Sequence, residues 1–225
     1  MFGWDKIEDD TVVHTLASAI RRDISFGVLT PDQKLKIDDL RTRYGGSKHS
    51  LRETLRVLST EGLVEAVAQR GFRVTSATDK DLHDISLVRI EIEKIALTRS
   101  IELGRVQWEG RVIAAHHALK KIEASINTDV DNLAVLEWDE ACRVFYAVLF
   151  EACDSARLID LQRKFFDQSR RFRLALLREG ELDFERRSHR LQAIVDAVLE
   201  RDVEKALPLL EEDIRDELRI VFSVK

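Results

Sequence analysis

The sequence has few residues that interrupt or cross-link a chain: two prolines, two cysteines and nine glycines among 225 residues. Cys142 and Cys153 lie in one predicted helix, too far apart along its axis to form a disulfide, so we expect reduced thiols. The chain also lacks an uncharged apolar run of about 18 residues and a secretory signal. We therefore expect a cytoplasmic protein with no membrane segment.

Net positive charge is also missing, since the formal charge of the chain is -5. That value by itself argues against nucleic acid as a partner. The charge is unevenly distributed, however. Between Lys34 and Arg73 there are nine lysines and arginines against five acidic residues. This segment is therefore a candidate nucleic-acid-binding region, and the acidic residues gather mostly after residue 77.

Hydrophobic periodicity predicts a mainly α protein. Three short helical patterns come first, over 11–26, 37–44 and 47–61. Within 62–80, β-favouring residues around a glycine-containing turn predict a hairpin followed by a polar connector. Six longer amphipathic stretches then predict an antiparallel bundle, approximately over 79–104, 106–126, 131–153, 155–179, 182–201 and 203–223. We predict a winged helix-turn-helix domain with a short β-hairpin wing at 1–76, and an all-helical domain at 77–225.

The third predicted helix has two chemically different sides. At 100° per residue, Leu51, Leu55 and Leu58 form one apolar stripe. The other side is cationic and consists of Lys48, His49, Arg52 and Arg56. In a winged helix-turn-helix this helix enters the major groove of DNA, where an arginine fork matches guanine or phosphate.

Two further features support DNA binding. Ser47 follows two glycines and is a good N-cap, so the helix start offers free amides to a phosphate. The hairpin tip combines polar residues with a glycine that permits close approach. The alternative is a solvated helix face, whose charge Glu53 and Glu61 offset. The predicted DNA-binding residues are Ser47, Lys48, His49, Ser50, Arg52, Arg56, Gln69, Arg70 and Gly71.

Two motifs lie within residues 11–74: ISFGVLTPDQKL and YGGSKHSLRETLRVLSTEGLVEAVAQRGFRV. On these motifs, the segment resembles the DNA-binding domain of the GntR family of bacterial regulators. Arg52, Gln69, Arg70 and Gly71 match DNA-contacting positions of the family. Lys48 stands where arginine is common, which weakens the case for a bidentate base contact there. The resemblance implies a homodimer that binds a palindromic operator in double-stranded DNA.

Residues 79–223 are similar to the FCD-type effector domain of the FadR subfamily, on the motifs ISLVRIEIEKIAL, WEGRVIAAHHAL and AIVDAVLERDVEKAL. The second motif resembles the branch of the carbon-starvation-induced regulator. Many FCD domains hold a metal with one aspartate or histidine and three histidines. The corresponding positions here are Cys142, Tyr146, Leu191 and Asp213. Asp139 and His189 lie near two of them, but a two-residue offset turns His189 about 200° away. We therefore expect no metal and no other cofactor.

The resemblance implies a small-molecule effector, possibly a carboxylate, and we predict an effector site at Arg89, Cys142, Tyr146 and Asp213. Arg89 matches an arginine close to the family's effector, and a buried arginine suits a carboxylate. A salt bridge from Arg89 to Glu93, at i+4, is an equally weighted alternative.

The predicted function is therefore transcriptional regulation, most simply repression, with operator binding modulated by a small organic acid. An enzyme is disfavoured, because no HExxH motif, phosphate-binding glycine loop, GxSxG elbow or Cys/His pair is present. A winged-helix interaction module that binds neither DNA nor effector is the other alternative.

Overall fold

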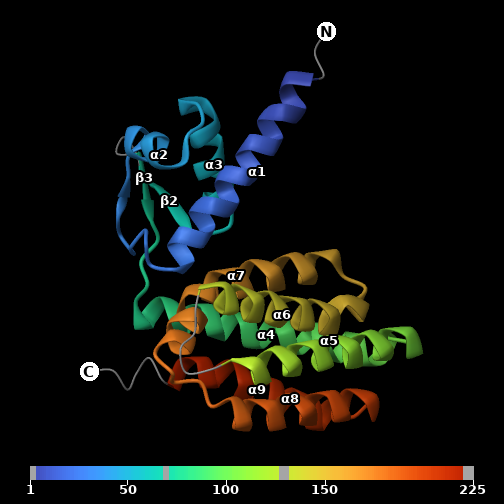
Figure 1. Cartoon of the computed structure of the whole chain (residues 1–225). Coiled ribbons are helices and arrows are strands. Elements are labelled where there is room, and N and C mark those ends of the chain that lie inside the picture. The colour runs from blue at the N-terminus through green and yellow to red at the C-terminus, as the bar shows by residue number, and fades with distance from the viewer. Residues whose placement is uncertain (1–3, 68–70, 127–131, 220–225) are drawn as a thin grey trace. The chain divides into compact units, whose positions relative to one another are not determined.

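The computed structural model describes residues 4–67, 71–126 and 132–219. Within them the chain divides into two units, with the boundary between Thr78 and Asp79 (Figure 1). None of the helices in these ranges combines the length and the apolar character that crossing a membrane requires.

The first unit contains three helices and a small sheet. Its elements are α1 (Trp4–Ser25), β1 (Lys34–Leu35), α2 (Ile37–Tyr44), α3 (Lys48–Thr60), β2 (Val64–Val67) and β3 (Gly71–Val74). The sheet is antiparallel with the order β1-β3-β2; Val64 lies opposite Val74, and Lys34 lies opposite Arg73. The predicted winged helix-turn-helix is confirmed. Strand β1 was not predicted, because two residues are too few to show a period.

The core of this unit forms between α1, α3 and the sheet. Ile20, Leu51, Leu55 and Leu58 are fully buried in it, as the helical period of the leucines predicts. The turn before α3 depends on Gly46, which has a φ of 81° and whose Cβ, if present, would lie 3.0 Å from a methyl carbon of Leu16. Glycine therefore allows α3 to begin close against α1.

The second unit is a bundle of helices. Its elements are α4 (Asp79–Leu103), α5 (Val106–Ser125), α6 (Asn132–Phe150), the short 3-10 turn η1 (Glu151–Cys153), α7 (Ala156–Arg178), α8 (Phe184–Leu199) and α9 (Val203–Arg219). Helix α4 packs on α7 and α9, α5 packs on α6, and α8 packs on α9. Figure 1 shows the helices of this unit lying roughly along one direction.

The bundle agrees with the helical pattern of the sequence, and its core is aromatic. Trp108 and Trp138 are buried, and both cysteines are buried free thiols. One boundary differs from the prediction: the helix expected over 131–153 ends in the 3-10 turn, after which Asp154 adopts a left-handed φ of 52°. The bundle also buries many charged residues.

Candidate functional site

The exposed side of α3 carries the cationic residues that the sequence analysis selected. The structure exposes Lys48, His49, Arg52 and Arg56. Their neighbours Leu51, Leu55 and Leu58 are buried on the opposite side. We call the four exposed side chains the cationic face of α3. A helix with one packed side and one charged, accessible side has the form that a major groove admits.

The start of α3 is capped by a side chain. Ser47 Oγ accepts a hydrogen bond from the backbone N–H of Ser50 at 3.0 Å. Ser50 differs from its predicted position at the DNA surface, because it is only 4% exposed and its hydroxyl lies 2.7 Å from that of Ser47. It precedes Thr54 and Leu58 by four and eight residues, which places it on the buried stripe. Ser50 therefore supports the cap, and we leave it out of the DNA-binding proposal.

The cations of this face differ in their partners. Lys48 Nζ lies 2.8 Å from Asp38 Oδ1 of α2, and Arg56 pairs with Glu53 in its own helix. Arg52 is exposed and forms no ion pair within the described ranges. Hydrogen bonding to Lys48, together with the charges of Lys48, Arg41 and Arg52, holds the pKa of Asp38 below its usual range. The role of Asp38 could not be predicted from the sequence, because α2 and α3 meet only in the tertiary structure.

The hairpin is described only in part. Gln69 and Arg70 lie outside the described residues, so their assignment stays a prediction. Gly71 is the first residue of β3; it is exposed and its φ is 87°. Apart from its chain neighbours, no described residue has an atom within 4 Å of where its Cβ would be. The backbone at Gly71 is therefore open to close approach.

The second candidate site is a buried charged cluster in the helical bundle. We call it the buried arginine cluster; it consists of Arg89, Arg173, Arg187 and Arg190 with Glu93, Glu123, Asp139 and Asp213. None of these residues is more than 8% exposed. Equal numbers of cations and anions offset the high cost of burying isolated charges. Each of the helices α4 to α9 contributes at least one member.

Asp213 of α9 receives several donors. The hydroxyl of Tyr146 donates to its Oδ2, while Arg190 Nε and Nη2 both lie 3.1 Å from its Oδ1 and Arg187 Nη1 lies 3.4 Å from the same atom. Burial alone would raise the pKa of Asp213, but Arg187 and Arg190 outweigh burial and hold it below its usual range. Asp213 is therefore an anion at neutral pH.

Arg187 of α8 extends this group of contacts across the bundle. Its Nε donates to Glu123 Oε1 at 3.0 Å, and its Nη2 lies 3.6 Å from Cys142 Sγ. Burial raises the pKa of Cys142 to about 12, so the sulfur remains a thiol. Three predicted effector residues, Cys142, Tyr146 and Asp213, thus lie together around a guanidinium. Arg187 and Arg190 were not among the predicted effector residues. Their i, i+3 spacing places them on the same side of α8, and this spacing was the available signal in the sequence.

Arg89, the fourth predicted effector residue, lies at the other end of the cluster. Its Nε donates to Glu93 Oε1 at 3.0 Å and its Nη1 to Ser169 Oγ at 2.9 Å. The salt bridge that the sequence analysis kept as an alternative is therefore present. The ring of Phe166 lies between the two ends of the cluster. Its centroid is 5.3 Å from the Arg89 guanidinium and 5.5 Å from the centroid of the Tyr146 ring.

The residues at the family's metal-ligand positions do not fit a divalent ion. Leu191 has no donor atom, Cys142 keeps its proton, and both oxygens of Asp213 already accept hydrogen bonds. His189 is exposed, whereas Arg187 and Arg190 of the same helix are buried. In the described ranges no group of three histidine, cysteine or acidic side chains has the arrangement of a metal site. A guanidinium supplies the positive charge at this point instead.

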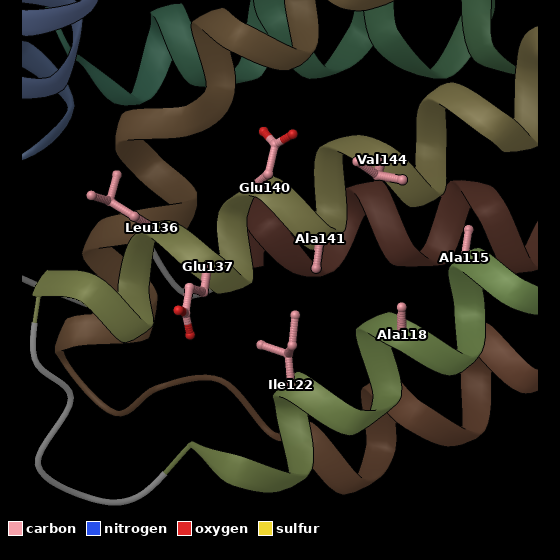
Figure 2. A pocket seen from close by; sticks show the side chains of 8 residues that line it. All are labelled: Ala115, Ala118, Ile122, Leu136, Glu137, Glu140, Ala141 and Val144. Atoms are coloured by element: carbon pink, nitrogen blue, oxygen red, sulfur yellow. The ribbon is translucent and has the colours of Figure 1, made fainter.

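A separate groove lies on the surface between α5 and α6 (Figure 2). Its walls are mostly apolar and consist of Ala115, Ala118, Ile122, Leu136, Ala141 and Val144, with the carboxylates of Glu137 and Glu140 beside them. Among the described residues that line it, none is a cation. These residues therefore offer an anionic ligand apolar contact and repulsion, but no charged donor.

A winged helix-turn-helix with a cationic recognition helix, followed by a helical bundle, defines a DNA-binding regulator with a ligand-binding domain. The family model of bacterial regulatory proteins of the gntR family matches residues 13–74, and the FCD domain model matches residues 84–216. The chain belongs to the GntR family, and it is a helix-turn-helix transcriptional regulator with an FCD effector-binding domain.

Relatives agree with this assignment. The HTH-type transcriptional repressor GlaR of Escherichia coli (strain K12) is 32% identical over 205 residues, which cover 90% of this chain and 92% of GlaR. The HTH-type transcriptional regulator BphR of Paraburkholderia xenovorans (strain LB400) is 31% identical, with 94% and 85% covered. The solved structure of E. coli McbR/YncC is similar with a TM-score of 0.72 and 15% identity, and the match covers 94% of this chain and 97% of the McbR/YncC chain. At this identity the likeness supports the fold alone.

Proposed function

We propose that this regulator is a cytoplasmic homodimeric repressor that binds a palindromic operator through the cationic face of α3, and that releases or retains DNA in response to a small organic acid. The observation that carries the proposal is the accessible, cationic side of a capped helix whose other side is buried. Repression is supported by the similarity to a protein that is named a transcriptional repressor. A two-fold dimer would match the two halves of a palindrome.

Within this face Arg52 is the strongest candidate for reading a base. It is exposed and is not held by an ion pair in the described ranges, so its planar fork is available to guanine or phosphate. Lys48 and Arg56 must first leave Asp38 and Glu53. Ser47 and the helix start add backbone donors for a phosphate.

The buried arginine cluster is the proposed effector site. A carboxylate that entered would replace a protein carboxylate as the partner of a guanidinium, so that no buried charge would be left alone. Arg187 is the best anchor, because it already contacts Glu123, Asp213 and Cys142 from one guanidinium. Since every helix of the bundle contributes to the cluster, such an exchange would change how the helices pack. The effector would then favour one of two arrangements of the bundle.

The proposed effector site holds no metal, because a guanidinium lies where the family's ion would provide positive charge. The regulator would also bind and release the acid unchanged, without catalysis. Metal analysis of protein purified without chelators tests the first point, since about one ion per chain would contradict it. Recovery of each candidate acid unaltered after incubation tests the second.

DNA binding is tested with Arg52→Ala, using a duplex selected from a randomised pool by the wild-type protein. We expect weaker binding in either case. If Arg52 contacts a base, the preference for that base should be relaxed; if it contacts a phosphate, the salt slope should be smaller by about one. Arg157→Ala, which removes an exposed arginine of α7, is the matched control and should bind as wild type does. Equal affinity of the two variants would remove Arg52 from the interface. If the wild-type protein showed no salt-dependent DNA binding, the interaction-module alternative would stand.

The effector site is tested by thermal denaturation with a panel of small organic acids. A ligand that prefers the folded protein raises the melting temperature. Arg187→Lys keeps the charge but loses the fork, so it should abolish that rise. Arg186→Lys makes the same change at the neighbouring surface residue and should leave the rise intact. An undiminished rise in Arg187→Lys would place the acid elsewhere.

A further inference from the structure

An acidic side chain lies within the proposed DNA-binding surface. Asp38 is in the first turn of α2, and its carboxylate contacts Lys48 at the start of α3. The Asp38 side chain is 75% exposed and that of Lys48 is 53% exposed. Arg41 and Arg52 are close enough to act on its charge. A carboxylate among the cations that should meet phosphates is unexpected in a surface built only for affinity.

The fold gives little reason for this ion pair. Both side chains are accessible, and exposed pairs of this kind contribute little to stability because water and salt screen them. An acid in the first turn does favour helix α2 through the helix dipole, but Asp39 occupies that turn as well. The position of Asp38 beside Lys48 is therefore better explained by what the surface binds.

The charge of Asp38 has two opposite effects at a DNA surface. Its low pKa keeps it ionised at neutral pH, so it repels phosphates and holds Lys48 back from them. In the major groove, however, a carboxylate is the natural acceptor for the exocyclic amino group of cytosine. A DNA sequence that presents a cytosine amino group at this position compensates for the repulsion between the carboxylate and the phosphates, whereas other DNA sequences do not.

We propose that Asp38 is a specificity-determining residue of the DNA-binding face: it restrains Lys48 on non-cognate DNA and accepts a hydrogen bond from a cytosine amino group in the operator. The inference rests on the proposed function, in which α3 binds DNA. It assigns to α2 a part in reading the sequence. Selectivity then arises partly from a repulsive element that only the correct sequence neutralises.

The test compares Asp38→Asn with Asp39→Asn in the full chain. Both variants remove one exposed acid from the first turn of α2, but only Asp38 contacts Lys48. The probes are a duplex selected from a randomised pool by the wild-type protein and a scrambled duplex of the same composition. Affinities for both are measured by fluorescence anisotropy over a range of salt concentrations.

We expect Asp38→Asn to bind the scrambled duplex more tightly and to lose discrimination between the two duplexes by roughly fivefold or more, the scale of one base contact. Its salt slope on the scrambled duplex should increase by about one, because Lys48 becomes free to meet a phosphate. In a Lys48→Ala background the increase in slope should vanish. Selection repeated with Asp38→Ala, whose side chain has no acceptor, should lose the preference for cytosine at one position in each half-site.

Equal effects of Asp38→Asn and Asp39→Asn would overturn the inference, because the change would then reflect general charge. An unchanged selected motif would also overturn it. Both results leave DNA binding by α3 intact. If selection with the wild-type protein enriches no duplex from the pool, the proposed function itself fails. Equal melting temperatures of the two variants show that the comparison concerns binding and not folding.

Discussion

The substitution Asp213→Asn provides a direct test of the buried arginine cluster. Asp213 is 1% exposed and accepts hydrogen bonds from Tyr146, Arg187 and Arg190. Asparagine keeps the shape and one acceptor oxygen but removes the negative charge that balances two buried guanidiniums. Removing one partner of a buried ion pair costs about 3–5 kcal/mol. Because an acceptor remains, we expect a loss near the lower limit.

Urea denaturation measures this loss. A loss of about 3 kcal/mol with an m-value of about 2–3 kcal/mol/M lowers the unfolding midpoint by about 1–1.5 M. The fluorescence of Trp108 and Trp138 reports on the bundle, because both indoles are buried there. The third tryptophan, Trp4, belongs to the first unit, so the experiment is performed in a Trp4→Phe background.

Asp216→Asn is the matched control, one turn away on α9. Its carboxylate is 21% exposed and contacts Arg190 Nη1 at 2.6 Å. Arg190 keeps Asp213 as a partner when Asp216 is neutralised, so we expect a clearly smaller loss than that from Asp213→Asn. Equal losses from the two variants would refute the view that Asp213 is the charge that holds this part of the cluster together.

The pH dependence of the same pair of proteins provides a second check. Because the pKa of Asp213 is lowered in the folded protein, its contribution to stability is present above the unfolded pKa and is lost as pH falls through the folded value. The stability difference between wild type and Asp213→Asn should thus be constant near neutral pH. It should shrink below pH 3.8, the ordinary aspartate value. A stability difference between the two proteins that increased as pH fell would contradict a lowered pKa of Asp213.

Two further pairs of variants test local features of each unit. Gly104→Ala should destabilise the bundle by about 1–3 kcal/mol or more in urea denaturation, because a Cβ would lie 2.1 Å from a ring carbon of Trp108. Gly110→Ala should instead stabilise it by about 0.5–1 kcal/mol, because beyond its chain neighbours and the backbone of α5 no described atom lies within 4 Å of the added Cβ. If Gly110→Ala were the more destabilising of the two variants, the close packing of Trp108 against Gly104 would be contradicted. Ser47→Ala should reduce stability by about 1 kcal/mol, because it removes the cap of α3. Ser47→Asp should keep the cap but bind DNA more weakly in an anisotropy measurement, because it adds an anion at the proposed phosphate site. Undiminished DNA binding by Ser47→Asp would place the phosphate elsewhere.

The local pattern of the sequence was sufficient to predict the helices and the two sides of α3. Leu51, Leu55 and Leu58 recur with the helical period, and that period is a property of neighbouring residues along one chain. The same wheel places Ser50 on the buried stripe. With 4% of its surface exposed, Ser50 is poorly placed for the DNA contact that was predicted for it.

The contacts between side chains of different helices were decided by the tertiary structure. The contact between Asp38 and Lys48 joins α2 to α3, and the contacts of Arg187 with Glu123 and Asp213 join α8 to α5 and α9. In the sequence each of these residues is one charged side chain among many. A charge becomes a partner only when folding brings its counter-ion within a few ångströms, and the strength of the pair depends on how much water the packed helices exclude. The amino-acid sequence thus determined the elements and the family, while the packing of the helices determined which charges meet.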